Sequence, residues 1–401
     1  MGLARRFRLY GRQTGVGLSR IDYLLELLTH IPKGILLMNP RPLCTQHFLF
    51  LILFPFIFFP LTLAPAHASC GSASCFLNVG NQPSVQPAGT ARVDIAYAYI
   101  PQKNPQNRVA AVNIEGKEQI LDEHQEFETI NQQIRLNVNY GITDNFSLQL
   151  TVPVIVRDHD HQIEVGVEPD SGPNEGEGKF ENFDTAGIGD IRLMAKYGFL
   201  PSLRSLFVVG AGVEFPTGEF EARNSEGKIQ EPTLQIGRGD YGVVGQFYQA
   251  YELIPHTLNQ FFSYTYRHTF KNKFDYQFGD THIVTGGLIY NMTSAIALSG
   301  QLNWIYKVHD RFKSSLKQAG GIGSGLAGTT DIDEDVHMRR VRNTGSSNLL
   351  LTPGITVNFN DSTSWYFYSQ VPLVQDFNGG LEQGVSFLTG FVKFFNINGT
   401  T

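Results

Sequence analysis

The sequence predicts an all-β protein, a transmembrane antiparallel up-and-down β-barrel of about 12 strands with long extracellular loops and short periplasmic turns. Three observations predict it. Residues alternate between apolar and polar in segment after segment, the connections alternate between long and short, and an export signal precedes them all. Because one alternating segment is a weak signal, the repetition along the chain decides the fold class.

The stretch 185–215, TAGIGDIRLMAKYGFLPSLRSLFVVGAGVEF, shows the pattern most clearly, as two strands joined by a short turn. One face is apolar and carries Ile191, Leu193, Ala195, Tyr197, Phe199, Phe207, Val209, Ala211, Val213 and Phe215. The other face mixes both charge signs with glycine, whereas a soluble sandwich usually carries many Lys, Glu and Thr residues there. A hairpin between lipid and a polar lumen is therefore predicted.

The same alternation predicts the other strands in order. The predicted strands are 91–100, 132–140, 146–156, 191–199, 207–215, 239–252, 262–270, 284–290, 296–307, 349–359, 365–374 and 384–395. In the first, Val93 and Ile95 alternate with Arg92 and Asp94, and the last ends on aromatic residues, which resembles the assembly signal of bacterial outer-membrane proteins. The sequence leaves open which face of 239–252 meets lipid.

Five of the predicted connections are short turns and six are longer loops. The turns contain residues that tight turns favour, as in Thr143-Asp144-Asn145, whereas 101–124, 158–184 and 309–344 are long and polar. Regular alternation of this kind is typical of outer-membrane barrels. It predicts that the N- and C-terminal ends of the barrel chain both lie on the periplasmic side.

The composition fits a lipid-facing barrel. Only 17% of the 401 residues are charged, and 30 Phe and 16 Tyr stand against 2 Trp. No segment of the predicted mature chain is long and apolar enough to cross a membrane as a helix. The net charge of −6 is mild and argues against nucleic acid as a partner.

The N-terminal part predicts export. Residues 47–64, HFLFLILFPFIFFPLTLA, follow a basic residue and precede Ala66-His67-Ala68, a small-residue cleavage signal. A membrane anchor is the alternative, which two prolines in the apolar run disfavour. The predicted parts are 1–37, an N-terminal extension from a misassigned start; 38–68, signal peptide; 69–89, periplasmic segment; 90–395, outer-membrane barrel; and 396–401, a tail.

Two cysteines remain in the predicted mature chain. Cys70 and Cys75 lie just after the cleavage point in SCGSASC, and in an oxidising compartment they most simply form a disulfide. A lipidated Cys70 and a metal-binding pair are the alternatives. Two thiols without neighbouring histidines make a poor metal site.

Three motifs resemble a known family. GIGDIRLMAKYGF, the following VGAGVEFPTG and the C-terminal TGFVKFF resemble the bacterial outer-membrane transporter-like family "putative MetA-pathway of phenol degradation". CGSASC followed by ARVDIAYAYI resembles one subgroup of it. The resemblance covers roughly residues 70–395. It implies a β-barrel with a pore or transport role, loosely linked by its name to aromatic compounds, and it brings no catalytic residues.

Other motifs carry little chemistry. His159-Asp160-His161 could ligate a metal, but residues of this kind in an acidic surface loop are more often solvated. Residues 320–325, GGIGSG, lack the lysine and the strand-to-helix setting of a phosphate loop. His268 and His282 come with no nucleophile motif. The sequence therefore predicts no enzyme, no cofactor and no metal site.

The polar faces of the predicted strands are the candidate functional residues. The predicted lumen-facing set is Arg92, Asp94, Arg135, Asn137, Asn139, Arg157, Asp190, Arg192, Lys196, Glu214, Arg267, Gln301, Asn303 and Lys307. A barrel of about 12 strands lies between the filled interior of 8 strands and the open channel of 16 or more. The predicted function is a transporter or narrow channel for small molecules, aromatic or hydrophobic ones among them. A closed structural or surface-interaction barrel is the alternative.

The predicted partners follow from this location. They are outer-membrane lipid and lipopolysaccharide, the barrel-assembly machinery during insertion, and a small-molecule solute.

Overall fold

The structure is a computed structural model, and it describes residues 83–105, 111–114, 117–120, 124–163, 179–223, 227, 229–312, 339–340, 344–377 and 381–397. The predicted extension 1–37, the signal peptide 38–68 and the pair Cys70 and Cys75 lie outside these residues. A search of the described part of the chain for a long apolar helix that could span a membrane found none.

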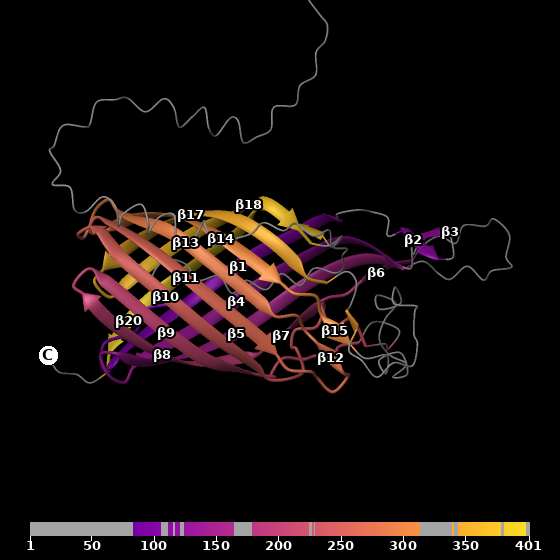
Figure 1. The fold of residues 1–401 in the computed structure, drawn as a ribbon, viewed down its shortest axis with the longest axis horizontal. Coiled ribbons are helices and arrows are strands. Elements are labelled where there is room, and N and C mark those ends of the chain that lie inside the picture. The colour runs from indigo at the N-terminus through magenta and orange to yellow at the C-terminus, as the bar shows by residue number, and fades with distance from the viewer. Residues whose placement is uncertain are drawn as a thin grey trace, which may run out of the picture. The chain divides into compact units, whose positions relative to one another are not determined.

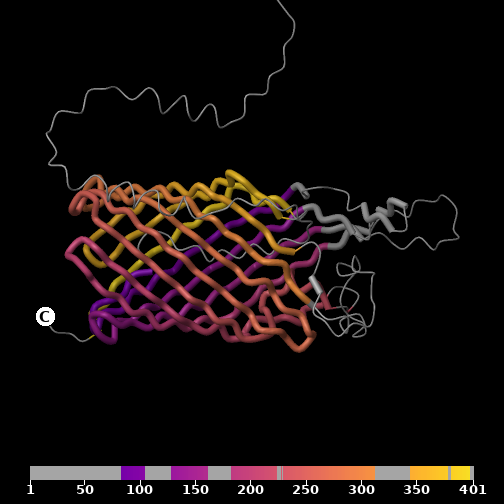
Figure 2. Tube along the Cα trace, in the orientation of Figure 1, coloured from indigo at the N-terminus to yellow at the C-terminus, as the bar shows by residue number. Residues whose placement is uncertain are grey.

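Twelve long antiparallel strands close into one barrel (Figures 1 and 2). They are β1 (Thr90–Pro105), β4 (His124–Gly141), β5 (Phe146–Ile163), β8 (Ile191–Ser202), β9 (Ser205–Phe215), β10 (Gly242–Ile254), β11 (Leu258–Thr269), β13 (Thr281–Asn291), β14 (Ile296–Lys307), β17 (Ser346–Asn360), β18 (Thr363–Asp376) and β20 (Ser386–Asn396). Each strand pairs with the next along the chain, and β1 pairs with both β4 and β20. The predicted fold class is confirmed. Closure satisfies every strand edge, which hydrocarbon requires.

Short strands accompany the longer connections. They are β2 (Ala111–Ile114), β3 (Lys117–Ile120), β6 (Lys179–Asn182), β7 (Thr185–Ile188), β12 (Tyr276–Gln277), β15 (Arg311–Phe312), β16 (Arg339–Arg340) and β19 (Leu381–Gln383). β2 pairs with β3, β12 with β15, and β15 with β16. β6 and β7 extend the pairing along β5, and β19 extends the pairing along β1.

Two predicted loops begin too early, and one of them also ends one residue too late. The prediction of a loop from residue 158 is wrong at its start, because β5 continues to Ile163. The predicted loop 101–124 also contains the end of β1, the β2–β3 hairpin and the first residue of β4. The physical reason is pairing. β4 begins at His124 and pairs His124 with Ile163, so polar residues that show no apolar alternation still join the ladder.

The alternation in the sequence separates two faces of the wall. On the outer face, Leu193 is 42% exposed and Tyr197 is 50% exposed. On the inner face of the same strand, Met194 and Lys196 are each 2% exposed. β10, whose faces the sequence left open, follows the same rule with Val244 buried and Val243 exposed.

Aromatic side chains mark both ends of the outer face. Near the short turns, Phe207 stacks on Phe199 with ring centroids 5.3 Å apart, and Phe247 lies 6.2 Å from Phe207. Near the long loops, Phe215 contacts Tyr241 edge-on at 5.9 Å. Such belts lie at the two water interfaces of a membrane barrel. The span between them is therefore the apolar band.

The short and long connections separate to opposite ends of the barrel (Figure 1). The five short ones span 142–145, 203–204, 255–257, 292–295 and 361–362. The first barrel strand begins, and the last one ends, on the same side as these turns, where Thr90 pairs with Asn396. Gly89 there donates its backbone N–H to the carbonyl of Gly141 at 2.8 Å.

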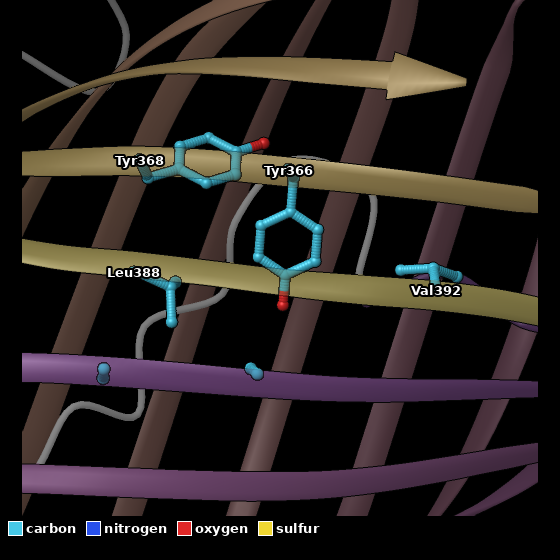
Figure 3. Close-up of a cluster of buried hydrophobic side chains, with 6 residues drawn as sticks. Tyr366, Tyr368, Leu388 and Val392 are labelled. Carbon is cyan, nitrogen blue, oxygen red and sulfur yellow. The ribbon is translucent and has the colours of Figure 1, made fainter. Parts of the chain in front are cut away.

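Two tyrosines lie across glycines on the inner wall. Tyr366 reaches from β18 across β20 (Figure 3), and its hydroxyl donates to Asp94 Oδ1 at 2.9 Å. A Cβ at Gly390 would lie 2.5 Å from the Tyr366 hydroxyl, and one at Gly354 would lie 2.1 Å from Tyr368 Cδ1. The rings occupy the space that these glycines leave, and they form a cluster with Ala96, Ala98, Leu388 and Val392.

This contact gives a prediction. Gly354→Ala should destabilise the barrel by roughly 1–3 kcal/mol, as overpacking of a filled site does, because the Tyr368 ring must move. Gly300→Ala on the neighbouring strand is the matched control, since its Cβ would meet nothing within 4 Å. Urea unfolding in lipid vesicles, followed by tryptophan fluorescence, measures both. Equal stability of the two variants would show that the ring does not fill the site.

Candidate functional site: the barrel interior

The inner face holds most of the candidate polar residues. Those buried are Arg92, Asp94, Arg135, Asn139, Arg157, Lys196, Glu214, Arg267, Gln301 and Asn303. Those of intermediate exposure are Asn137, Asp190, Arg192 and Lys307. All of them except Asp190, which lies between β7 and β8, alternate with lipid-band residues on the same strands, so the register of the sheet points them inward.

Three charged residues on three different strands form an ion cluster. Glu214 on β9 accepts from Arg192 on β8, at 3.0 Å from Nε and 2.6 Å from Nη2, and also from Arg267 Nε on β11. β10 lies between Glu214 and Arg267, and its residue at this level is Gly242. A Cβ there would lie 3.0 Å from Glu214 Oε2, so the glycine leaves the carboxylate room to reach across β10.

The β9–β10 connection, residues 216–241, is tied to this cluster. Asp190 Oδ1 accepts from the backbone N–H of Gly218 at 3.1 Å, and its Oδ2 accepts from that of Arg238 at 3.0 Å. The Arg238 side chain donates to Thr269 Oγ1 at 3.0 Å. Burial lowers the pKa of Arg238, while Glu214, Asp190 and Asp310 act in the opposite direction.

Residues 233–236 of connection 216–241 lie buried against the inner wall. Leu234 is 1% exposed, and Thr233, Gln235 and Ile236 are buried beside it. Arg157 on β5 donates from Nη1 to the carbonyls of Thr233 at 2.8 Å and Gln235 at 3.2 Å. Its Nε donates to Asn131 Oδ1 at 2.7 Å. The buried guanidinium of Arg157 therefore holds the connection against the inner wall. The connection narrows the interior at the long-loop end.

The segment 83–89, which precedes β1, narrows the interior at the short-turn end. Val85 packs against an inner-face cluster of Val208, Tyr248 and Phe261. A Cβ at Gly198 would lie 2.6 Å from Val85 Cγ2, so this glycine makes room for the segment. The carbonyl of Ser84 accepts from Asn139 Nδ2 at 3.0 Å.

Asp310 joins the loops at the mouth. It is fully buried and accepts from the Tyr276 hydroxyl at 2.6 Å and from the Gly279 N–H at 2.7 Å. Lys307 Nζ lies 3.0 Å from it. A small pocket beside this group is lined by aromatic rings and by Arg238, which lies 5.0 Å above the Phe278 ring.

Another part of the inner wall carries a neutral hydrogen-bond ladder. Thr285 donates to Asn303 Oδ1 at 2.9 Å, Gln301 donates to the same oxygen at 2.8 Å, and Asn303 donates to Thr352 at 2.7 Å. These hydrogen bonds link two residues of β14 and join β14 to its neighbours β13 and β17. This part of the wall is polar without net charge.

The candidate metal motif lies elsewhere than expected. The prediction of a solvated loop is wrong for His159, which is a buried residue of β5 and shares a hydrogen bond of 2.8 Å with Thr129 Oγ1. The side chain of His161 lies outside the described residues. Among the side chains that the structure describes, no group of three or more His, Cys, Asp and Glu could hold a metal ion.

Sequence reasoning missed the residues that narrow the interior. The connection between the predicted strands 207–215 and 239–252 and the periplasmic segment 69–89 were predicted without any contact to the interior, and Arg238 and Asp310 were not singled out. A signal existed in Leu234 and Ile236, an apolar pair inside a polar loop. Segment 83–89 offers a weaker one, since Val85 is its single large apolar residue besides two prolines.

A closed barrel with an apolar outer band and a polar interior defines an outer-membrane β-barrel protein. The chain belongs to the family described as "Putative MetA-pathway of phenol degradation", whose sequence model matches residues 139–360. This confirms the predicted family.

Solved structures were also compared. The COG4313 outer membrane channel from Pseudomonas putida F1 is 13% identical with a TM-score of 0.51, over 79% of this chain and 99% of that one. The toluene transporter TbuX from Ralstonia pickettii is 9% identical with a TM-score of 0.38, over 77% of this chain and 90% of that one. Only the first likeness is close enough to support the fold. The comparison with curated proteins found no match.

Proposed function

We propose that this protein is an outer-membrane channel or transporter for small molecules, aromatic or hydrophobic ones among them, and that it is not an enzyme. One observation carries the proposal. The closed barrel has an inner face rich in buried polar and charged side chains, among them Arg92, Asp94, Glu214 and Arg267, and connection 216–241 and segment 83–89 narrow the interior at its two ends. The family's name refers to phenol degradation, and the similar structure from Pseudomonas putida F1 is described as an outer membrane channel.

The proposal includes an orientation. Long loops face the exterior and short turns the periplasm, so the barrel termini and segment 83–89 are periplasmic. The lumen-facing set then lines the path between the two narrowings, from Arg157 and the Glu214 cluster to Asn139. The outer leaflet supplies lipopolysaccharide around the long-loop end, and the barrel-assembly machinery inserts the chain.

Conductance in planar bilayers tests the function. The purified, heat-modifiable barrel should give discrete current steps, and vesicles that contain it should take up small aromatic solutes faster than vesicles without it. Absence of both from a well-folded barrel would favour the alternative, a closed structural barrel. The narrowing at both ends is the observation in favour of that alternative.

Arg157→Ala should widen the path. The change removes the donor to the carbonyls of Thr233 and Gln235, which releases connection 216–241 from the wall. Hydrogen bonds from a charged donor contribute roughly 1.5–3 kcal/mol each. Single-channel conductance should therefore rise, with longer open times. Arg223→Ala is the matched control, because Arg223 lies exposed in the same connection and donates to Gly227. Unchanged conductance in Arg157→Ala would mean that the connection does not limit flow.

A further inference from the structure

The inner face of the twelve long strands carries more cations than carboxylates. Among the described side chains that alternation points inward, seven are cationic: Arg92, Arg135, Arg157, Arg192, Lys196, Arg267 and Lys307. Three are carboxylates: Asp94, Glu214 and Glu252. All of these side chains are buried or of intermediate exposure. The inner wall is therefore positive, whereas the whole chain has a net charge of −6.

Neutral oxygen atoms hold two of these cations. Lys196 Nζ on β8 donates to Gln149 Oε1 at 2.5 Å. Arg157 on β5 donates to two backbone carbonyls of connection 216–241 and to Asn131 Oδ1. Amide and carbonyl oxygens are neutral acceptors. These hydrogen bonds therefore satisfy the donors without cancelling their charge.

The ion pairs of the wall compensate only part of the remaining charge. Glu214 on β9 pairs with both Arg192 on β8 and Arg267 on β11, so this cluster of three keeps one positive charge. Arg92 and Asp94, with 3.0 Å between Nη2 and Oδ2, form a neutral pair. The excess of positive charge is thus spread over several neighbouring strands.

Charged residues of the connections that lie against the inner wall reduce this excess without removing it. Asp190, Glu231 and Asp310 add three carboxylates, and Arg238 adds one cation, which gives eight cations and six carboxylates. Asp310 lies at the mouth, where Lys307 Nζ is 3.0 Å from it. Five of the seven inward cations of the strands are arginines, which stay protonated at neutral pH. The positive sign of the wall is therefore retained there.

A fixed charge acts on mobile ions through its field, so it needs no direct contact with them. Between low-dielectric walls, charges of one sign raise the local concentration of ions of the other sign. The field extends over about 8–10 Å at physiological ionic strength, and connection 216–241 and segment 83–89 narrow the interior. Rings of Arg and Lys make pores selective for anions for the same reason.

We infer that the barrel interior favours small anions over small cations, and that Lys196 and Arg157 contribute to this preference because neutral oxygens hold them. The inference rests on the proposed transport function and adds the charge of the preferred solute to it. A neutral solute of the same size feels the field only weakly, so the wall neither favours nor excludes it.

Reversal potentials in a potassium chloride gradient across a planar bilayer test the inference in the full-length protein. The wild type should have a chloride-to-potassium permeability ratio above one. Lys196→Gln should lower the ratio roughly twofold to fourfold, the effect of removing one unit charge several ångströms from the path in screened solvent. Lys196→Glu should lower it further. Lys393→Gln is the matched control and should leave the ratio unchanged, because Lys393 is exposed on the outer face of β20.

The outcomes separate the anion preference from the proposed function. A wild-type barrel that conducts with a ratio of one or below would overturn the preference and leave the channel intact. An unchanged ratio in a folded Lys196→Gln variant would overturn the role of Lys196. If the wild-type barrel shows neither conductance nor solute uptake, the proposed function fails, and the preference fails with it. The wild-type measurement needs no variant, so poor folding of Lys196→Gln leaves a decisive result.

Discussion

Leu193→Arg should strongly impair assembly of the barrel. Leu193 lies on the outer face of β8, 42% exposed and opposite Val213, between the aromatic belts. An arginine on the lipid face of a barrel costs about 2–4 kcal/mol at the bilayer midplane and less toward the interfaces. The folded fraction after refolding into vesicles, measured as the heat-modifiable band on an unboiled gel, should fall sharply.

The neighbouring residue provides the control. Met194 lies on the inner face of the same strand and is 2% exposed. Met194→Gln places a polar side chain of similar length beside other polar groups, so assembly should be close to that of the wild type. Because the side-chain period of a strand is two, a shift of one residue would exchange the two outcomes. Equal tolerance of both changes would contradict the assignment of the outer face to lipid.

Glu214→Gln should cause the largest loss of stability among changes inside the barrel. The carboxylate serves two guanidinium groups, and its side chain is 3% exposed. Removing one partner of a buried ion pair costs about 3–5 kcal/mol, because the remaining charge has no compensation. The loss of stability is expected at the lower end of this range, since Arg192 keeps 11% of its side-chain surface exposed.

Urea unfolding in vesicles measures this loss, with Glu128→Gln as the matched control. Glu128 pairs with Lys103, whose side chain is 58% exposed, and such surface pairs contribute about 0–1 kcal/mol. The double variant Glu214→Gln/Arg267→Gln should recover part of the stability, because it removes one of the two arginines that Glu214→Gln leaves without a carboxylate. A single variant as stable as the Glu128→Gln control would show that lumen water already screens the cluster.

Much of the fold could be predicted because membrane embedding imposes a simple rule on each strand. Leu193 and Arg192 are neighbours in sequence, and hydrocarbon and a polar interior require opposite side chains at these two positions. The rule is local, so twelve strands and the order of short and long connections were predicted from the chain alone. It fails where a strand leaves the membrane, which is why the extension of β5 to Ile163 was missed.

The candidate site was predicted as a list of inward-pointing residues, without their partners. Alternation places Glu214 and Arg267 on one face of their strands, yet their contact depends on Gly242 of the strand between them. Likewise, Lys196 reads in the sequence as one cation among several. In the structure its Nζ bonds to the amide oxygen of Gln149, whereas Arg92, Arg192 and Arg267 each pair with a carboxylate.

The sequence by itself determined the barrel, its two faces and its family, because each of these follows from residues close together in the chain. The tertiary structure alone decided where the interior narrows and which charges compensate one another. Connection 216–241 folds inward because Arg157, far away on β5, holds its carbonyls, and segment 83–89 does so because Gly198 leaves space for Val85. Contacts between distant segments depend on closure of the sheet. The pattern of neighbouring residues in the chain does not specify which distant segments closure brings together.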